Sequence, residues 1–535
     1  MHKVVIIGAG HNGLVCSCYL ARAGMAVTLL EGRHLVGGSA ITDEFHPGFR
    51  NSVASYTVSL LHPKVIRDLH LVEHGLRIVS RPISNYLPLA NGGGFVLYPD
   101  AARTQQELAR FSKRDAGQLP AYYEMLSSSV DLVRQVMMQS PPVMANGGVG
   151  DIVTALKMAN RLRRLSLHDK QSLLNLFTKS AGEILDGYFE SDPIKAAFGF
   201  DSVVGSFASP YSPGSAYGLL HHVLGETNGV QGSWGHALGG MGSITQAMLR
   251  EAQKLAVEVK TNVTVIKVKV ADERVQGVVL GDGSEIEADV VVSSVNPKVL
   301  FLQLIEADQL DPSVLTHFDR YQNCSASFRM NVALAEAPRF EDNNASRDPE
   351  HLQAGIILAP SLRYMEEAHT SAKRNGWSDK PIIEVLIPST IDDSLAPANQ
   401  HVASLFCQHF DPYMAAGWED CKERVADLII DTVNDYAPNF RDQVLGRMVL
   451  SPLDLEEQFG LTGGDISHGR MSLDQLYSAR PMLGMGNYRS PIGSLYMCGA
   501  GTHPGGGVSG IPGHNAAREI LNDSRAGFSR WTKRQ

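Results

Sequence analysis

The feature that most constrains the fold is a glycine-rich turn between a strand and a helix, within the first 38 residues. Residues 3–7 form an apolar, β-branched run that is typical of a buried parallel strand. The turn follows at once, with Gly8, Gly10 and Gly13 in the spacing G-x-G-x-x-G. A helical stretch and a second strand come next, and that strand ends at Glu31. This order predicts a Rossmann-type unit that binds a dinucleotide.

Each residue of the turn has a predicted role at the dinucleotide. Gly8 permits the tight turn, Gly10 lets a pyrophosphate approach the backbone, and Gly13 lets the helix pack closely against the strand. The free N–H groups at the start of the helix would face the phosphates, and we place Asn12 in the same site. Glu31 lies 18 residues after Gly13, near the spacing at which a carboxylate binds a ribose hydroxyl.

The segment that begins at Glu31 indicates which dinucleotide is bound. Residues 31–38 resemble the Glu-x-Arg-x-x-x-Gly-Gly extension of FAD-binding amine oxidases and phytoene desaturases. By that resemblance, Arg33 approaches the ribose and pyrophosphate of FAD, and the glycine pair lies against the phosphates. The residues of this segment that we predict to bind FAD are Glu31, Gly32, Arg33, Gly37, Gly38 and Ser39.

A second glycine-rich turn lies towards the other end of the chain. Residues 495–510 lead from a strand into this turn, and a helix is expected from Ile511 to about Leu521. The N-terminus of that helix can hold a phosphate or the electron-rich pyrimidine edge of a flavin. Two distant segments would thus build one cofactor site. Its predicted residues here are Gly499, Gly501, Gly507 and Val508.

The middle of the chain supplies the remaining part of the predicted FAD domain. Residues 263–288 have the pattern of a hairpin around an Asp-Gly turn at 282–283, and residues 289–294 that of a buried strand. By resemblance to flavoenzymes of this fold, the backbone of Val263 meets the adenine edge. We place Ser293 in the same site.

A third glycine cluster, at residues 239–242, does not indicate a second dinucleotide site. Such a site needs a strand directly before the glycines, and residues 234–238 make a poor strand. We therefore reject an NAD(P)-binding domain here and expect a backbone turn close to the flavin or substrate.

Composition narrows the class of protein. A chain of 535 residues is too long for a single simple hydrophobic core, so two domains are expected. The formal charge of −9 argues against general affinity for nucleic acid. The six cysteines include no Cys-x-x-Cys pair, which argues against a dithiol redox centre and predicts buried free thiols. His221 and His222 have no acidic partner at metal-ligand spacing, so no metal is expected. A strand that begins near residue 3 leaves no room for a signal peptide, and the expected location is the cytoplasm.

Two interleaved domains are predicted. Segments 1–76, 230–300 and 450–535 would form a discontinuous FAD domain, and segments 77–229 and 301–449 a substrate or cap domain. A mixed sheet with covering helices in the cap would enclose an apolar cavity beside the flavin. Helices are expected at residues 60–76, 104–115, 119–137 and 418–436, and strands at residues 324–334, 382–387 and 401–406.

Residues 151–179 form a helical pattern with a basic face. Apolar residues recur at spacings of three and four from Ile152 to Leu165, and Lys157 and Arg161 lie among them. One interpretation is a surface that touches anionic lipid, where an apolar substrate would enter. The other, which we favour from the sequence, is a cap-domain helix with a solvated basic face. Peripheral membrane contact is therefore the alternative here.

Further motifs identify the family that the chain resembles. In addition to the N-terminal block, residues 55–61, 74–77, 459–469 and 503–507 look like those of one family. Over nearly its whole length the chain is similar to the phytoene desaturase-related flavoproteins, and most similar to the subgroup called pyridine nucleotide-disulfide oxidoreductase domain-containing protein 2. The resemblance implies an α/β (overall α+β) fold, with a Rossmann-type FAD domain of the glutathione-reductase and amine-oxidase type and an interleaved cap. It also implies noncovalent FAD and an apolar substrate.

Three residues are candidates for catalysis: Tyr56, Arg329 and His503. Tyr56 lies in a segment expected to run towards the flavin, where its hydroxyl would bind flavin or substrate. Arg329 stands where many relatives carry a lysine, and this departure argues against an amine-oxidase-like reaction. His503 would transfer a proton, or else fix its loop through a backbone hydrogen bond. Asp465 and His468 would form an acid–base pair, a dimer contact, or a turn held by the aspartate.

The sequence thus predicts an FAD-dependent oxidoreductase that passes a hydride from a carbon atom of an apolar substrate to the flavin. The expected substrate is isoprenoid-like, polyene-like or another lipid. Two alternatives stay open: a redox-neutral flavin-dependent isomerase, and a flavoprotein with a regulatory or partner-binding role. The electron acceptor is unspecified, and a homodimer is one option for the assembly.

Overall fold

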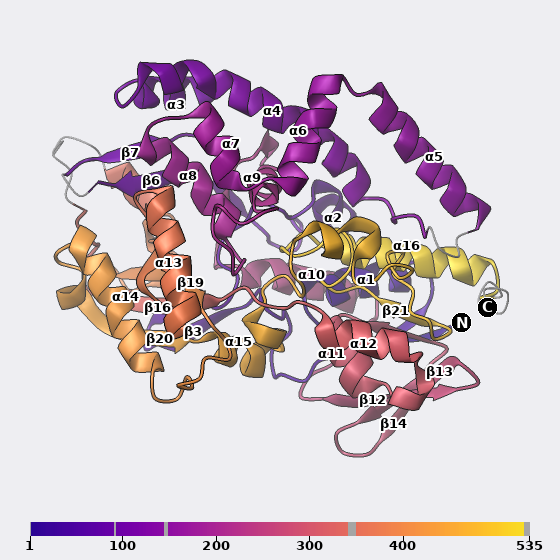
Figure 1. The fold of residues 1–535 in the computed structure, drawn as a ribbon. Helices are drawn as coiled ribbons and strands as arrows, with labels where there is room; N and C mark the ends of the chain where they lie inside the picture. The colour runs from indigo at the N-terminus through magenta and orange to yellow at the C-terminus, as the bar shows by residue number, and fades with distance from the viewer. Residues whose placement is uncertain (1, 90–91, 144–147, 341–348, 529–535) are drawn as a thin grey trace.

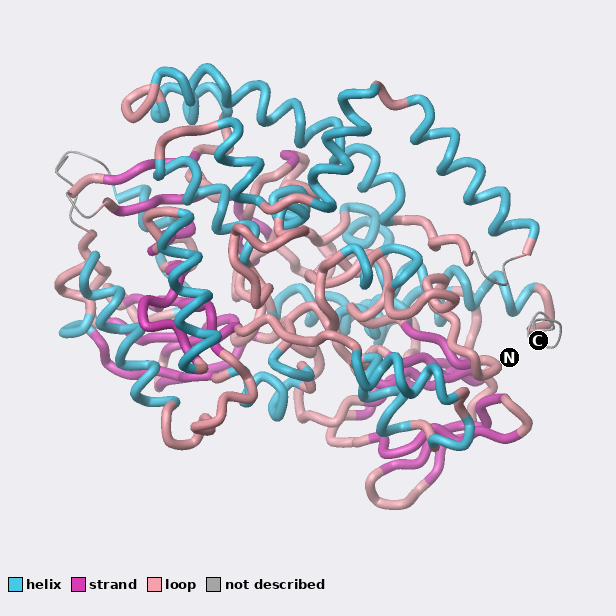
Figure 2. The backbone as a smooth tube through the Cα atoms, in the orientation of Figure 1, coloured by secondary structure: helices cyan, strands magenta, loops and turns pink. Residues whose placement is uncertain are grey.

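A five-stranded parallel sheet lies at the centre of one half of the molecule (Figure 1, Figure 2). The computed structural model describes residues 2–89, 92–143, 148–340 and 349–528. The strand order is β11-β2-β1-β15-β21, and every neighbouring pair is parallel. The carboxyl ends of all five strands therefore meet at one edge. The strands are β1 (Lys3–Ile7), β2 (Ala26–Leu30), β11 (Glu258–Lys260), β15 (Val290–Ser293) and β21 (Leu495–Met497).

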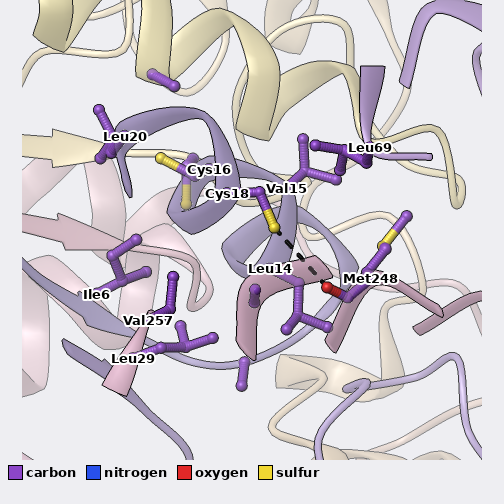
Figure 3. Close-up of a cluster of buried hydrophobic side chains, with 14 of the residues drawn as sticks. Ile6, Leu14, Val15, Cys16, Cys18, Leu20, Leu29, Leu69, Met248 and Val257 are labelled. Carbon is purple, nitrogen blue, oxygen red and sulfur yellow. Dashed lines mark hydrogen bonds between the residues drawn. The ribbon is translucent and has the colours of Figure 1, made fainter. Parts of the chain in front are cut away.

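Three helices cover one face of this sheet: α1 (His11–Arg22), α10 (Gly242–Lys254) and α16 (Ile511–Arg525). Helix α1 packs against both of the others. Their buried side chains form one core, in which Leu14 and Cys18 of α1 lie with Met248 of α10 (Figure 3). Ile6 and Leu29 supply the sheet's side of this core. The thiol of Cys18 donates a hydrogen bond to the Met248 carbonyl at 3.8 Å.

The opposite face of the parallel sheet packs on a smaller layer. Its antiparallel strands are β12 (Val265–Ala271), β13 (Arg274–Leu280) and β14 (Glu285–Glu287), with helices α11 (Pro297–Val299) and α12 (Pro312–Arg320) beside them. Because side chains alternate along a strand, Val5 and Ile7 face this layer whereas Ile6 faces the helices. The hairpin between β13 and β14 turns at 282–283, as the sequence predicts.

A seven-stranded mixed sheet organises the other half, in the order β20-β16-β19-β18-β17-β6-β7. All of its pairs are antiparallel except β17 with β6. Helix α14 (Lys422–Tyr436) packs on one face, and helix α13 (Leu362–Asn375) runs beside β18. The strands are β6 (Asn85–Pro88), β7 (Gly94–Leu97), β16 (Ser327–Leu334), β17 (Gly355–Leu358), β18 (Trp377–Leu386), β19 (His401–Phe410) and β20 (Val444–Leu450).

A group of helices covers the second face of this sheet. Alternation again separates the faces, because Ile382 lies in the core shared with these helices and Ile383 in the core shared with α14. The helices are α3 (Ala101–Leu108), α4 (Lys113–Met137), α6 (Leu167–Thr178), α7 (Ala181–Tyr188), α8 (Asp192–Val203) and α9 (Ala216–His222). Helix α5 (Val149–Arg164) lies outside this core. Shorter elements complete the chain: β3 (Thr42–His46), β4 (Phe49–Ser52), α2 (Pro63–Asp68), β5 (Ile78–Ser80), β8 (Glu226–Thr227), β9 (Val230–Gln231), β10 (Gly235–Ala237) and α15 (Pro452–Phe459).

The two large sheets draw on different stretches of the chain. The parallel sheet takes strands from the first, middle and last segments that the sequence assigns to the FAD domain. The seven-stranded sheet takes its strands from the segments between them. The domain boundaries themselves stay a prediction.

Several elements differ from the expectations. The helix expected over 104–115 is interrupted, since α3 ends at Leu108 and α4 begins at Lys113. The helix expected over 151–179 is two helices, because Ser166 caps a new helix by accepting a hydrogen bond from the Asp169 N–H. The helix expected over 60–76 is limited to α2, which is followed by turns up to Gly75. The poor strand before the third glycine cluster does form, as β10, but it pairs antiparallel with β5 outside the parallel sheet. This topology, rather than a missing strand, is what separates the third glycine cluster from a dinucleotide-binding unit.

None of the helices in the described ranges has the length and apolar character needed to cross a bilayer.

Candidate cofactor and substrate site

A cavity of about 620 Å³ runs from the carboxyl edge of the parallel sheet to β19 of the seven-stranded sheet. Segments from both ends and from the middle of the chain line it. The parallel topology explains this meeting, because the loops that follow the strands converge at one edge. The predicted site residues that line the cavity are Gly8, Gly10, Asn12, Glu31, Gly32, Arg33, Gly38, Ser39, Tyr56, Val263, Gly507 and Val508.

The first glycine turn has the geometry of a phosphate cradle. Gly8 adopts a φ of +92°, and Gly10 precedes α1 without any side-chain cap on the first N–H groups of the helix. A Cβ on Gly10 would lie 3.8 Å from the Gly38 Cα, so the turn itself has room and the glycine keeps the cavity side open. A Cβ on Gly13 would lie 2.1 Å from the Gly8 carbonyl oxygen, so close packing of α1 on β1 requires glycine there.

Glu31 and Arg33 are held in place at this end of the cavity. One carboxylate oxygen of Glu31 accepts a hydrogen bond from the Ala9 N–H at 2.9 Å, and the other accepts from the Arg33 N–H at 3.1 Å. The Arg33 guanidinium donates to the Gly38 carbonyl at 3.3 Å and lies 4.3 Å from the Phe459 ring centroid. The Val263 N–H donates to the Glu31 carbonyl at 2.9 Å, and the predicted contact of the Val263 backbone with adenine stays a prediction.

The residues around this end fit FAD. Three buried polar atoms of cavity-lining residues have no hydrogen-bond partner among the described residues: His11 Nε2, Asn12 Oδ1 and His468 Nδ1. A pyrophosphate and a ribityl chain would supply partners for such atoms, and unpaired buried polar groups are otherwise costly. Burial lowers the pKa of His11 to about 4, so the ring binds as a neutral hydrogen-bonding group. Helix α1 directs its positive end towards the same space.

Five predicted cofactor residues lie outside the cavity lining. A Cβ at Gly37 would lie 2.8 Å from the Ala40 carbonyl oxygen, and one at Gly499 2.4 Å from the Ser294 carbonyl oxygen. One at Gly501 would lie 2.4 Å from Pro297. These glycines, like Gly13, let backbone segments approach closely and so shape the loops behind the site. Ser293 ends β15 beneath the loops, with its hydroxyl unpartnered among the described residues.

The far end of the cavity has an aromatic wall. The ring of Tyr56 stacks on Phe406 with centroids 5.3 Å apart, and Trp234 lies nearby against His222 at 5.5 Å. The Tyr56 hydroxyl donates to Glu384 Oε2 at 2.6 Å. Burial and the adjacent Glu384 raise the pKa of Tyr56 well above its usual value, so the phenol stays neutral. Tyr56 therefore presents its ring to the cavity and its polar end to Glu384.

Arg329 supports this wall from outside the cavity lining. Its guanidinium lies 4.6 Å from the Tyr56 ring centroid and donates to the Leu405 carbonyl and the Ser404 hydroxyl, both at 2.8 Å. A second buried arginine, Arg81, donates to Thr57, which lines the cavity beside Tyr56. Arg329 therefore contacts Tyr56 without lining the cavity, and its role in catalysis stays a prediction.

Two histidines at the end of α9 line the cavity, although sequence reasoning assigned them no role beyond exclusion of a metal. His221 meets the backbone of Gly506, and burial lowers its pKa to about 3. His222 directs Nδ1 to the Gly218 carbonyl at 3.0 Å. Because a carbonyl only accepts, Nδ1 carries the proton and the lone pair lies on Nε2. Asp201 lies close enough to interact electrostatically with His222, and burial raises the pKa of Asp201 to about 6.

His503 lies behind the glycine-rich loop, outside the cavity lining. Its Nε2–H donates to the Val136 carbonyl at 3.0 Å, and its ring packs edge-on against Tyr477. Burial lowers its pKa to about 4. This is the geometry of the loop-fixing alternative, and the predicted proton-transfer role gains no support from it.

The turn at 463–469 reaches the cavity through His468, but Asp465 has a different task. The Asp465 carboxylate accepts from the Ser325 hydroxyl at 3.0 Å and from the N–H groups of Ser467 and Gly469 at 2.8 and 2.9 Å. It therefore holds the turn. Burial lowers the pKa of His468 to about 4, so this ring faces the cavity uncharged.

Arg480 is a structural residue that no sequence pattern indicates. It is fully buried and donates to the Ala500 carbonyl at 2.8 Å and to the Ser467 carbonyl at 2.6 Å, with further carbonyls of that turn around it. One guanidinium thus joins the turn at 463–469 to the second glycine-rich loop. Glu384 did carry a sequence signal, because it is a lone acid within the apolar strand 382–387.

All six cysteines are free. Five are buried, and burial raises the pKa of Cys16 well above its usual value and that of Cys18 to about 12. Such thiols are poor nucleophiles. The prediction of buried free thiols thus holds for every cysteine except Cys324, which is partly exposed.

Comparisons with known proteins identify the family. The family model described as flavin containing amine oxidoreductase matches residues 13–357. The chain is 39% identical over 544 residues to "Pyridine nucleotide-disulfide oxidoreductase domain-containing protein 2" of Rattus norvegicus, covering 98% of this chain and 94% of that protein. It is 24% identical to a limonene dehydrogenase subunit of Castellaniella defragrans, covering 99% and 95%. It is also 24% identical to "Phytoene desaturase (lycopene-forming)" of Pseudescherichia vulneris, covering 96% and 97%.

Solved structures share the fold at low sequence identity. An oxidoreductase from Methanosarcina mazei aligns with a TM-score of 0.59 at 15% identity, covering 97% of this chain and 100% of that one. Putrescine oxidase bound to putrescine aligns with a TM-score of 0.57 at 15% identity, covering 98% and 99%. The expected fold class and the resemblance to phytoene desaturase-related flavoproteins are confirmed. The chain belongs to the flavin-containing amine oxidoreductase family, and it is an FAD-dependent oxidoreductase.

Proposed function

We propose that this enzyme dehydrogenates a carbon–carbon bond of an apolar substrate, isoprenoid-like, polyene-like or another lipid. The observation that carries the proposal is the aromatic wall formed by Tyr56, Phe406 and Trp234. The only hydroxyl of these three side chains is bonded to Glu384, so the wall offers ring surface. Such a wall binds hydrocarbon and excludes water.

Dehydrogenation removes a hydride and a proton from the substrate, and different groups accept them. When bound, FAD supplies the two-electron acceptor for a hydride from carbon. Formation of a C=C bond also releases a proton from the adjacent carbon, and His222 Nε2 carries a lone pair to accept it. Asp201 lies close enough to His222 to interact with it electrostatically. Hydride and proton together account for both hydrogens lost by the substrate.

The cavity lining argues against a primary role in amine oxidation. Among the described lining residues there is no lysine, and the two acidic ones, Glu31 and Glu457, do not belong to the aromatic wall. Arg329, where the family resemblance leads us to expect a lysine in many relatives, donates to the Leu405 carbonyl and the Ser404 hydroxyl. Two relatives are named as a limonene dehydrogenase subunit and a phytoene desaturase, and both names denote oxidation of hydrocarbon substrates.

The test is anaerobic reduction of the enzyme-bound flavin. Purified holoenzyme is mixed with terpenes, carotenoid precursors and long-chain acyl compounds in detergent micelles, and with primary amines as the matched control class. We expect a member of the apolar classes to bleach the oxidised flavin absorbance and to yield a product that has lost two hydrogens. Bleaching by amines alone would contradict the proposal. Conversion that needs pre-reduced flavin and consumes no electrons would instead show an isomerase.

A further inference from the structure

Helices α5 and α6 both expose several apolar side chains. None of the residues of α5 is buried, which sets it apart from an ordinary amphipathic core helix. Val149 is 79% exposed, Ile152 58% and Leu156 63%, and Leu167 at the start of α6 is 82% exposed. The three α5 residues are spaced by three and four, so they lie on one side of the helix. We call this face, with Leu174 of α6, the α5–α6 surface. In Figure 1, α5 runs along the outer edge of the molecule.

The same surface carries unpaired positive charge. Arg163 follows Leu156 by two turns on the same side of α5, and Lys157 and Arg164 flank it. In the ranges that the structure describes, no carboxylate lies within salt-bridge distance of these three cations, although many other exposed arginines are paired. Lys170 of α6 adds a fourth exposed cation, and it donates only to the Arg163 carbonyl. The whole chain has a formal charge of −9, so this basic patch is a local exception.

We propose that the α5–α6 surface docks the enzyme on an anionic lipid bilayer. Exposed Leu, Ile and Val side chains next to arginine and lysine match the boundary between acyl chains and phosphate headgroups. Nucleic acid would match the charge but leave the apolar residues in water. A second copy of this chain fits less well, because a two-fold contact would place this net-positive surface against an identical net-positive surface. The sequence pattern favours a solvated basic face on this helix, whereas the exposure of Val149, Ile152 and Leu156 over the first two turns of α5 favours the lipid contact.

The fold connects this surface with the cavity. Phe177 of α6 packs on Tyr217 of α9, with ring centroids 5.3 Å apart, and one turn later α9 presents His221 to the cavity. A smaller cavity of about 70 Å³ shares His221, His222 and Val204 with the large one, and it reaches Gly214, which bonds to the end of α6. This route rests on the proposed function: a bilayer-dissolved substrate would enter beside α6. The docking itself does not depend on the reaction.

The test is flotation of the full-length holoenzyme with vesicles. One set is phosphatidylcholine alone, and the other contains roughly 30% phosphatidylserine. We expect binding to the anionic vesicles, weaker binding to the neutral ones, and loss at high salt. The double variant I152E/L156E should lower the partition coefficient at least tenfold, and R163E/R164E should lower it by a similar factor, since each basic residue near an anionic surface contributes roughly fivefold. The matched control is I266E/L483E, which places glutamate at residues that are 50% and 70% exposed elsewhere.

The outcomes separate the possibilities. The amount of bound FAD, measured by absorbance, should be equal in all variants. Equal FAD content would show that the variants fold and that weaker membrane binding is not caused by loss of the cofactor. The proposal would be overturned if the wild type and both surface variants floated with anionic vesicles to the same extent. Absence of flotation, with a concentration-dependent dimer that I152E/L156E dissociates, would show a second copy as the occupant and would also overturn it. If no candidate substrate reduces the flavin, the flotation result is not affected. The proposed reaction and the proposed membrane docking can therefore be refuted independently.

Discussion

At Gly10, the absence of a Cβ is predicted to be necessary for FAD binding. Its Cβ would meet nothing in the protein closer than 3.8 Å, whereas a Cβ on Gly13 would meet the Gly8 carbonyl at 2.1 Å. Gly10→Ala should therefore fold normally and lose FAD, because the methyl group occupies the approach of the pyrophosphate. The measurement is flavin absorbance per chain, together with circular dichroism, and we expect FAD content to fall at least tenfold. Gly187→Ala in α7, where a Cβ meets nothing within 4 Å, is the control. An FAD content in Gly10→Ala equal to that of the control would refute the cradle.

His222 provides the second prediction at this scale. Gln in its place can still donate to the Gly218 carbonyl but cannot accept a proton at neutral pH. His222→Gln should slow anaerobic flavin reduction by about 10²–10⁴-fold with the substrate that bleaches wild type, and FAD content should not change. His221→Gln is the comparison, because a ring with a pKa of about 3 is no base at neutral pH, and its effect should stay below roughly tenfold. Equal losses in both variants would remove His222 from the proton-transfer role.

Two elements far apart in sequence are joined by Arg480, whose guanidinium bridges the Ser467 and Ala500 carbonyls. Lysine offers a single ammonium and cannot span both. Arg480→Lys should lower the free energy of unfolding by about 2–4 kcal/mol and weaken FAD retention, because it loosens the second glycine-rich loop. Thermal melts with and without added FAD measure this. Arg363→Lys, at a side chain that is 88% exposed, should change the melting temperature little. Equal melting temperatures for the two variants would contradict the bridging role.

The turn before α10 is tied to the loop before β19 by Asp392, which gives a pH dependence. Burial alone would raise the pKa of this carboxyl, but hydrogen bonds from His236 at 2.9 Å and from the Gly239 N–H at 2.7 Å hold it well below its usual value. A carboxyl whose pKa is lowered on folding stabilises the protein above its unfolded pKa of about 3.9 and loses that contribution as the pH falls towards the folded pKa.

Asp392→Asn should therefore destabilise the protein by about 2–4 kcal/mol at pH 7, and by less as the pH falls below about 4. Urea unfolding at several pH values tests this. Asp282→Asn, at an exposed hairpin turn, is the control. A destabilisation that stays constant down to the lowest pH at which the protein folds would show that the charge of Asp392 is not the cause.

For the whole molecule, sequence predicts what depends on neighbouring residues. Strand β1, the glycine turn, Glu31 and the Asp-Gly hairpin are local patterns, and all of them form. Local sequence patterns do not show which distant segments of the chain pack against each other. Tyr56 and Glu384 lie 328 positions apart, and only the packed sheets decide that one binds the other. For the same reason His503, which is near the cofactor loop in sequence, lies behind the cavity, whereas His222, which is remote in sequence, lines it.

One cavity, closed by remote segments, is proposed to hold FAD at its glycine-lined end and an apolar substrate at its aromatic end. A crystal structure of the holoenzyme with a bound hydrocarbon is the most direct test. We predict adenosine beside Glu31 and Val263, and the flavin ring between Val508 and the wall that contains Tyr56 and Trp234, with the hydrocarbon against that wall. A flavin ring directed away from Tyr56 and Trp234, or a hydrocarbon bound elsewhere, would contradict this arrangement.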